Sequence, residues 1–183
     1  MLWEAVLLGL IVGWLRNGKI KNLSRIPLPG WPLILLAVFI QSIIWIDFAG
    51  SFHFLTPIYP ILYTLSFAVL VLFFFLQGRQ AGFIIIGVGI LLNLLVITAN
   101  RGMMPVDSTY MPPNVAEELA AGEKSPFHTV MTDETWLAFL GDRIPVPYSR
   151  NQLLSIGDIV IAAGVVMLIQ QGMQGEKRKK QWR

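Results

Sequence analysis

Three polar side chains stand near the end of an apolar segment: Asn93, Asn100 and Arg101 in the stretch LLNLLVITANRGMMPV. Their amide and guanidinium groups can donate hydrogen bonds to an anionic or carbonyl-bearing ligand. Such groups are costly in hydrocarbon and normally face a protein interior or a watery cavity. The two asparagines are about two helical turns apart, so they share one face of a helix. This segment therefore predicts a polar pocket.

Asp158 supplies a carboxylate that could pair with Arg101. It lies in SIGDIVIAAG, about one turn into a later apolar segment. If the two segments touch as helices, the pair either staples them together or directs the guanidinium group toward a ligand. A third alternative is that Arg101 extends to the lipid headgroups. If the pair directs the guanidinium group toward a ligand, the polar groups that bind this ligand are Asn93, Asn100, Arg101 and Asp158.

Acid–base chemistry is a second possibility. His128, together with Asp133, Glu134 and Asp142, could supply a general base or the donors of a metal site. The spacing is unspecific, because no HExxH arrangement places two histidines on one helical face. We therefore predict no metal site, place His128 and Asp142 among the ligand-binding residues, and leave any cofactor open.

Other reactive groups are few. The chain has no cysteine, which excludes disulfides, thiolate nucleophiles and iron–sulfur clusters. Ser149 and Ser155 lack the G-x-S-x-G elbow, and neither a glycine-rich phosphate loop nor a basic nucleic-acid face is present. Four methionines near His128 are compatible with a soft-metal site or with flexible packing. They are Met103, Met104, Met111 and Met131.

The composition is that of a membrane protein. Of the 183 residues, 55% are hydrophobic and 14% are charged, whereas about a quarter of the residues in soluble domains are charged. The length suits one domain, so we predict a single membrane domain over residues 1–183. The lipid bilayer is then the first partner to expect, and nucleic acid is not expected.

Five apolar stretches could span, or nearly span, a bilayer. They cover residues 2–15, 31–46, 58–76, 81–99 and 153–170. A helix needs about 20 residues to cross the hydrocarbon core, so the first two are short. The first predicts a retained helix, because the basic residues follow it and no Ala-x-Ala site appears. The second could extend toward Phe48 or lie in a thinned bilayer. Together they predict an all-α bundle of about five transmembrane helices.

Glycines mark where these helices should pack closely. Gly9 and Gly13 form a G-x-x-x-G pattern in the first stretch, and Gly157 and Gly164 lie in the last. Small residues let helix backbones approach one another. The contacts could lie within one chain or between chains, which leaves a homo-oligomer or a membrane-protein partner open.

Basic residues predict the orientation. Lysines and arginines concentrate after the first stretch and in the tail, residues 172–183, as they do in cytoplasmic segments. Residues 102–151 carry more acids than bases. We therefore expect the N-terminus outside and the C-terminus inside a bacterial cytoplasmic (inner) membrane. Glu4, Asp47, His53 and Asp158 would then gather in the outer leaflet, around a cup that opens outward.

The connection over residues 102–151, here called the cap, is far longer than the usual link of about 2–8 residues, and such loops are usually functional or disordered. PPNVAEELAAG predicts a short helix that ends at Gly122. TDETWLAFLGD predicts another, with Thr132 or Asp133 as its N-cap. Residues 144–147 predict an extended strap. The second helix would bury one apolar side, made of Trp136, Leu137, Phe139 and Leu140.

The motifs N-x-G-x-M-P, here NRGMMP, and L-G-D-x-I-P-x-P, here LGDRIPVP, lie on either side of HTVMTDETWLAF and are followed by SIGD. In this pattern the chain resembles a family of small bacterial multi-pass membrane proteins catalogued only as a domain of unknown function. The resemblance implies that the region from Asn93 to Asp158 matters, and it supplies no chemistry. Arg101 departs from it, since the family is expected to have glycine there.

Two functions follow from these residues. The first is binding of a small or lipidic ligand, or of a membrane partner, in an outward-facing polar pocket. Its ligand-binding residues would be Asn93, Asn100, Arg101, Asp158, His128, Asp142 and Glu4. The alternative is a membrane-embedded enzyme that uses carboxylate acid–base chemistry on a lipid-linked or cell-envelope substrate. Transport is less favoured, because the stretches show no inverted repeat or broken mid-membrane helix.

Overall fold

The computed structural model describes residues 2–50, 53–146 and 152–175. Over these residues the chain is mostly helical, and four helices are long and apolar enough to cross a membrane. These are α2 (Pro32–Ala49), α3 (Tyr59–Phe75) together with the 3-10 turn Thr56–Ile58 before it, α4 (Ala81–Ala99) and α6 (Ile156–Gln174). A fifth apolar helix, α1 (Leu2–Leu15), is shorter.

The helices confirm the positions of the five predicted stretches. Two of them, α1 and α4, match residues 2–15 and 81–99 at both ends. The second, α2, extends to Ala49, beyond Phe48. The last prediction was wrong at its start, because Leu153–Leu154 form a short strand and α6 begins after Ser155. The basic tail lies outside the described residues from 176 onward.

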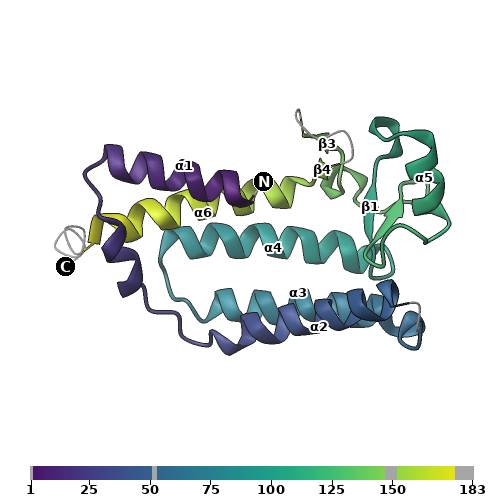
Figure 1. The fold of residues 1–183 in the computed structure, drawn as a ribbon, viewed down its shortest axis with the longest axis horizontal. Helices are drawn as coiled ribbons and strands as arrows, with labels where there is room; N and C mark the ends of the chain where they lie inside the picture. Colours follow the sequence, from purple (N-terminus) through teal and green to yellow (C-terminus); the bar gives the residue numbers. More distant parts are fainter. Residues whose placement is uncertain (1, 51–52, 147–151, 176–183) are drawn as a thin grey trace.

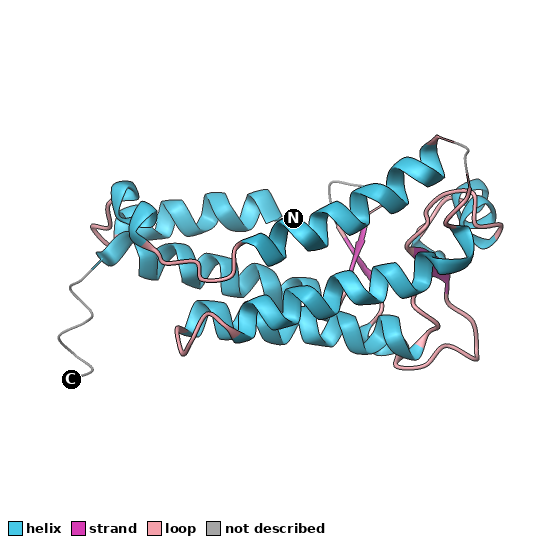
Figure 2. Cartoon of the chain, turned by 90° about the horizontal axis from the view of Figure 1, so that it is seen from below, coloured by secondary structure: helices cyan, strands magenta, loops and turns pink. Residues whose placement is uncertain are grey.

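The helices pack in a row in the order α1, α6, α4, α3, α2 (Figures 1 and 2). Figure 1 shows α1 and α6 running side by side toward the same end of the molecule, where α6 ends. The start of α1 lies closer to the N-terminal end of α6 than to its C-terminal end, and α1 leaves only the first turns of α6 uncovered. That uncovered part faces the cap.

Glycines allow α4 and α6 to approach closely. A Cβ atom at Gly89 would lie 2.6 Å from the carbonyl oxygen of Gly157, and one at Gly164 would lie 2.7 Å from Ile86. On the other side of α6, a Cβ atom at Gly9 would lie 3.0 Å from the Cβ atom of Ile169. The predicted close contacts therefore lie within one chain.

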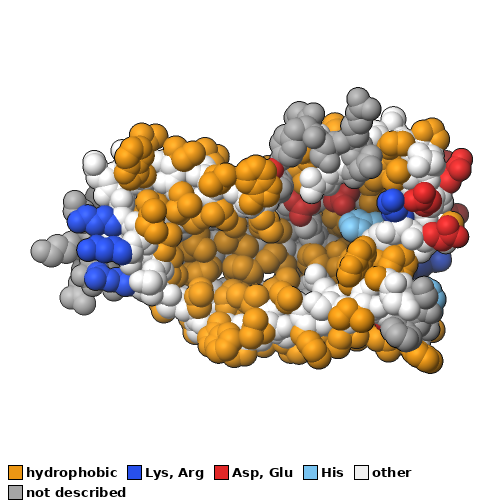
Figure 3. Space-filling model, in the orientation of Figure 1, with side chains coloured by type: hydrophobic (Ala, Val, Ile, Leu, Met, Phe, Trp, Pro, Cys, Tyr) orange, Lys and Arg blue, Asp and Glu red, His pale blue; other side chains and the backbone are white. Residues whose placement is uncertain are grey.

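The outward surfaces of the helices are apolar. Large side chains such as Trp14 and Phe75 are 71% and 84% exposed, and Figure 3 shows hydrophobic side chains covering the helical part of the molecule. Soluble monomers rarely expose apolar patches larger than a few hundred Å². Figure 3 also shows basic side chains at one end and acidic ones at the other. These surfaces indicate that the protein associates with a membrane.

Short strands that were not predicted lie in the cap and directly after it. Strand β1 (Met104–Val106) pairs in parallel with β2 (His128–Val130), and β3 (Ile144–Pro145) pairs in antiparallel fashion with β4 (Leu153–Leu154). Between β1 and β2 lies α5 (Pro113–Ala120), which confirms the first predicted cap helix. The predicted strap is extended at β3, and its last residue, Pro147, lies outside the described residues.

The second predicted cap helix was wrong. The segment forms turns and one short 3-10 helix, Ala138–Leu140, because Leu137 has a left-handed backbone with φ of 53°. A left-handed residue cannot continue a right-handed helix. The expected apolar side is also absent within this segment, since Trp136 is 72% exposed and only Leu140 of the four residues is buried.

Phe127 anchors the cap to the helices. Its ring stacks on Tyr63 of α3 with centroids 4.7 Å apart, and on Trp45 of α2 with centroids 6.2 Å apart. Phe127 also packs against the main buried cluster of the helices. It directly precedes β2, so this contact fixes one end of that strand.

Replacing Phe127 with alanine should loosen the cap. Loss of a packed phenylalanine ring costs about 3 kcal/mol, and hydrogen exchange at the β1–β2 pair should accelerate. The matched control is Phe139→Ala, because Phe139 is 56% exposed. Equal exchange rates in both variants would show that the stacked ring does not hold the cap.

Candidate functional site

A cavity of about 770 Å³ lies between the start of α1, the N-terminal part of α6 and the cap. Its walls are mostly apolar, and they come from all three parts. The apolar lining residues are Leu2, Trp3, Val106, Met111, Val115, Leu119, Leu153, Leu154 and Ile161. The polar lining residues are Lys124, Ser125, His128, Asp142, Gln152 and Asp158.

The cavity opens on the side of the molecule. Figure 3 is viewed across the helix axes, and it shows acidic and histidine side chains between the apolar helices and the cap. The cavity lining contains side chains of both kinds, His128, Asp142 and Asp158. If the helices cross a bilayer, this face is turned toward lipid.

Strand β1 places two of the polar residues. On one side it pairs with β2, which begins with His128. On the other side, the Asp142 N–H donates to Pro105 O at 2.9 Å and the Asp107 N–H donates to Asp142 O at 2.8 Å. The backbone of Asp142 is thus fixed at two points, and the side chains of His128 and Asp142 both reach the cavity.

His128 links two other polar side chains. Its Nδ1 atom is 2.7 Å from Ser125 Oγ, with which it shares a hydrogen bond. Its Nε2 atom is 3.6 Å from Asp142 Oδ2. The other carboxyl oxygen, Asp142 Oδ1, is buried and has no hydrogen-bond partner among the described residues. Asp142 Oδ1 is therefore available to form a hydrogen bond with a ligand.

Burial controls the protonation of this pair. The Asp142 side chain has a pKa raised to about 8, first by burial and then by the charge of Asp158. Burial lowers the pKa of His128, and the charge of Asp158 only partly opposes this. At neutral pH the favoured state is a protonated Asp142 beside a neutral imidazole, because burial disfavours both charged forms.

Asp158 is held in place by a capping box at the start of α6. The Ser155 N–H donates to Asp158 Oδ2 at 3.2 Å, and the Asp158 N–H donates to Ser155 Oγ at 2.9 Å. Asn93 of α4 joins this group, since its Nδ2 atom donates to Asp158 Oδ1 at 2.9 Å. Ser155 Oγ in turn donates to Asn93 Oδ1 at 2.9 Å. Asn93 is buried and positions Asp158 at the cavity wall.

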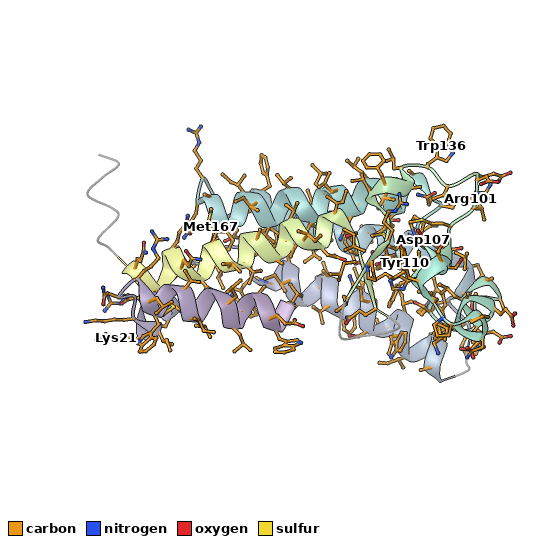
Figure 4. All side chains as sticks on the ribbon, turned by 90° about the horizontal axis from the view of Figure 1, so that it is seen from above. Lys21, Arg101, Asp107, Tyr110, Trp136 and Met167 are labelled. Atoms are coloured by element: carbon orange, nitrogen blue, oxygen red, sulfur yellow. The ribbon has the colours of Figure 1, made fainter. Side chains whose placement is uncertain are left out.

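Asn100 and Arg101 lie outside the cavity lining. Asn100 caps α4 by donating from Nδ2 to Val96 O, and it binds the Trp136 backbone through both its amide oxygen and its amide nitrogen. Arg101 is exposed at the cap end of the molecule, where Figure 4 labels it together with Trp136. The predicted Arg101–Asp158 pair was wrong: among the described residues, Asp158 bonds instead with Asn93 and Ser155.

The remaining predicted residues are dispersed. Glu4 follows Leu2 and Trp3, which line the cavity, but does not itself line it. Asp133 and Glu134 are exposed in the turns of the cap. In the described part of the chain, no group of three or more His, Asp or Glu side chains could hold a metal ion. Of the seven predicted ligand-binding residues, three therefore line one cavity: His128, Asp142 and Asp158.

Several lining residues were not predicted. Ser125, Lys124 and Gln152 contribute polar groups, and Trp3 contributes an apolar one. Ser125 stands three residues before His128, a spacing that could have drawn attention to the pair. Nothing in the local sequence connects Trp3 with the cap, because the contact depends on how α1 packs along α6.

The arrangement suits an amphiphilic ligand. The apolar chain of a ligand could lie against the apolar walls. Hydrogen-bond donors and acceptors for its polar head are available on β2, at Asp142 and on α6. A buried carboxyl group beside an imidazole can also hold or move a proton. The chemistry available is therefore recognition of a polar head on an apolar body, with a proton exchanged at Asp142.

The comparisons with known proteins identify a family and give no activity. An uncharacterized protein from Thermotoga maritima is 30% identical over 167 residues, which cover 90% of this chain and 88% of that protein. No solved structure matches the chain. The model of the family of unknown function DUF5317 matches residues 25–170. The chain therefore belongs to the DUF5317 family.

Proposed function

We propose that this protein binds an amphiphilic ligand, a lipid or a lipid-like small molecule, in the cavity between α1, α6 and the cap. The observation that carries the proposal is the cavity itself, whose volume of about 770 Å³ falls within the range of about 300–1,000 Å³ for small-molecule sites. Mostly apolar walls with a few convergent polar groups are typical of such sites.

The proposed setting is a bacterial cytoplasmic membrane, with five spans, the N-terminus outside and the C-terminus inside. The distribution of charge supports it, because the connection between α1 and α2 is basic and the cap is acidic. In this orientation the cavity lies in the outer leaflet and opens toward lipid. An acyl chain could then enter sideways, without leaving the hydrocarbon.

The test is native mass spectrometry of protein released gently from membranes. We expect one amphiphile to remain bound per chain, and to be lost in Val115→Phe, which fills the cavity from α5. Val88→Phe is the matched control, because Val88 is 46% exposed on α4. A protein without ligand, or equal retention by both variants, would contradict the proposal.

A membrane-embedded enzyme is the second candidate. The observation that favours it is the buried Asp142 carboxyl group, 3.6 Å from the imidazole of His128, since such a pair can act as acid and base. The same extracts separate the two functions. Recovery of two species related by a cleaved or transferred group, in a ratio that changes with His128→Ala, would favour an enzyme.

A further inference from the structure

We propose that the cavity selects an amphiphile with a cationic amine headgroup, which binds to the carboxyl groups of Asp142 and Asp158. This inference rests on the proposed function and adds the chemical class of its ligand. The hydrogen-bond partners and the charges of the polar lining residues support it.

Asp142 has an unused acceptor. Its residue is 8% exposed, its Oδ2 atom faces His128 Nε2 at 3.6 Å, and its Oδ1 atom is buried without a hydrogen-bond partner among the described residues. Buried polar atoms are nearly always paired, so an unpaired one calls for an explanation. A donor on a bound headgroup would supply the missing partner.

Asp158 of α6 adds a second acceptor to the cavity lining. Each of its carboxyl oxygens accepts one hydrogen bond, from Asn93 and from Ser155. A carboxylate oxygen can accept more than one, so capacity remains for a ligand. The capping box fixes this carboxylate in place, and a fixed acceptor loses little entropy when the ligand binds.

The charges near the cavity favour a cation. Among the lining residues, the carboxyl groups of Asp142 and Asp158 lie within electrostatic range of His128, whose pKa is lowered by burial. Lys124 is the one cationic lining residue in the described chain, and it already pairs with Glu118 at 3.1 Å on an exposed surface. Tyr63 of α3 also lies within electrostatic range of both carboxyl groups.

Other headgroups fit less well. An anion would meet two carboxyl groups, and the cation Lys124 at the cavity wall already pairs with Glu118. An uncharged head could fill the hydrogen bond at Asp142 but would leave the charge of Asp158 uncompensated. An ammonium group does both, because it donates hydrogen bonds and neutralises charge. The apolar walls, including Trp3, Leu119 and Ile161, then cover its chain.

Binding of a cation should also release a proton. In the empty cavity, burial and the Asp158 charge raise the pKa of Asp142 to about 8. A bound ammonium group favours the ionised carboxylate, so Asp142 gives up its proton when the ligand enters. Affinity should therefore increase with pH below about 8, at a rate of about tenfold per pH unit.

The experiment measures binding of radiolabelled dodecylamine to the full-length protein in phosphatidylcholine nanodiscs, with dodecyl sulfate and dodecanol as competitors. We expect saturable binding that dodecylamine displaces and the other two displace poorly. Affinity should fall about tenfold between pH 7.5 and pH 6.5. It should fall at least tenfold in Asp142→Asn, and should not change in Asp107→Asn, whose carboxyl group pairs with Arg143 outside the cavity lining.

The outcomes separate this inference from the proposed function. Equal displacement by dodecanol or dodecyl sulfate would overturn the proposal of an amine headgroup. So would an affinity for dodecylamine that changes neither with pH nor in Asp142→Asn. The proposed function would stand in that case if Val115→Phe abolished the binding. If none of the three amphiphiles bound in a way that Val115→Phe abolished, the proposed function would fail with the inference. The pH series on the wild-type protein decides the matter even if Asp142→Asn is not recovered folded.

Discussion

Replacing Gly89 with leucine is expected to separate α4 from α6 and to destroy the cavity. A Cβ atom at Gly89 would lie 2.6 Å from the carbonyl oxygen of Gly157 and 2.7 Å from Ile161 Cγ1. The backbone oxygen cannot move aside as a flexible side chain could, so the helices must part. Overpacking of a core usually costs about 1–3 kcal/mol, and a blocked backbone contact should exceed this range.

The measurement is the free energy of unfolding of the purified protein in mild detergent. Val88→Leu is the control, because Val88 is the neighbouring residue on α4 and is 46% exposed. We expect the control to unfold like the wild type, and Gly89→Leu to be unfolded or more than about 3 kcal/mol less stable. Similar stability of the two variants would show that α4 and α6 do not pack through these glycines.

Replacing Asp142 with asparagine is expected to stabilise the ligand-free protein above neutral pH. The pKa of Asp142 is raised to about 8, while an unfolded aspartate titrates near 3.9. Between these values the folded state retains a proton that the unfolded state has lost, so stability falls as the pH rises. Asparagine does not titrate, so the free energy of unfolding of Asp142→Asn does not depend on pH through this residue.

The cleanest window is pH 7 to 8. Above pH 7 the imidazole of His128, whose pKa is lowered by burial, is mainly neutral in both the folded and the unfolded state and contributes little slope. There the wild type should lose about 1 kcal/mol per pH unit, and Asp142→Asn should lose almost none. Asp107→Asn serves as the control, and parallel pH profiles for wild type and Asp142→Asn would contradict a buried, protonated carboxyl group.

The helices could be predicted from the sequence because their signal is local. Each stretch is predominantly apolar, and boundaries such as Ala81 and Ala99 have polar neighbours, Gln80 and Asn100. Close contacts were also predictable, since Gly9, Gly157 and Gly164 stand at regular positions on apolar helices. The order in which the helices pack was not predictable, because all five have similar apolar surfaces.

The site was predicted only in part, for reasons that the structure makes clear. Asn93 and Asp158 are costly in an apolar helix and so had to meet a polar partner. Asn100 and Arg101 gave the same signal but stand at a helix end, where Asn100 caps the backbone and water is close. The pairing of His128 with Asp142 depends on β1, whose register no local pattern predicts.

The shape of the cap escaped prediction for a similar reason. TDETWLAFLGD has acceptable helix signals, but Asn100 binds the Trp136 backbone and Leu137 adopts a left-handed conformation. A tertiary hydrogen bond thus outweighs a weak local preference. α5 was predictable because Pro112 and Pro113 mark its start and Gly122 follows its end.

The most direct test of the account is to locate an acyl chain on the protein in its own membrane. Cells would be fed a fatty acid that carries a photoactivatable diazirine, irradiated, and the adducts mapped by mass spectrometry of peptides. Adducts should concentrate on the cavity walls, at Trp3, Val115 and Ile161, and Val115→Phe should remove them but leave adducts on exposed α2 residues. Adducts spread evenly over the lipid-facing helices, and unchanged in Val115→Phe, would contradict a lipid-binding cavity.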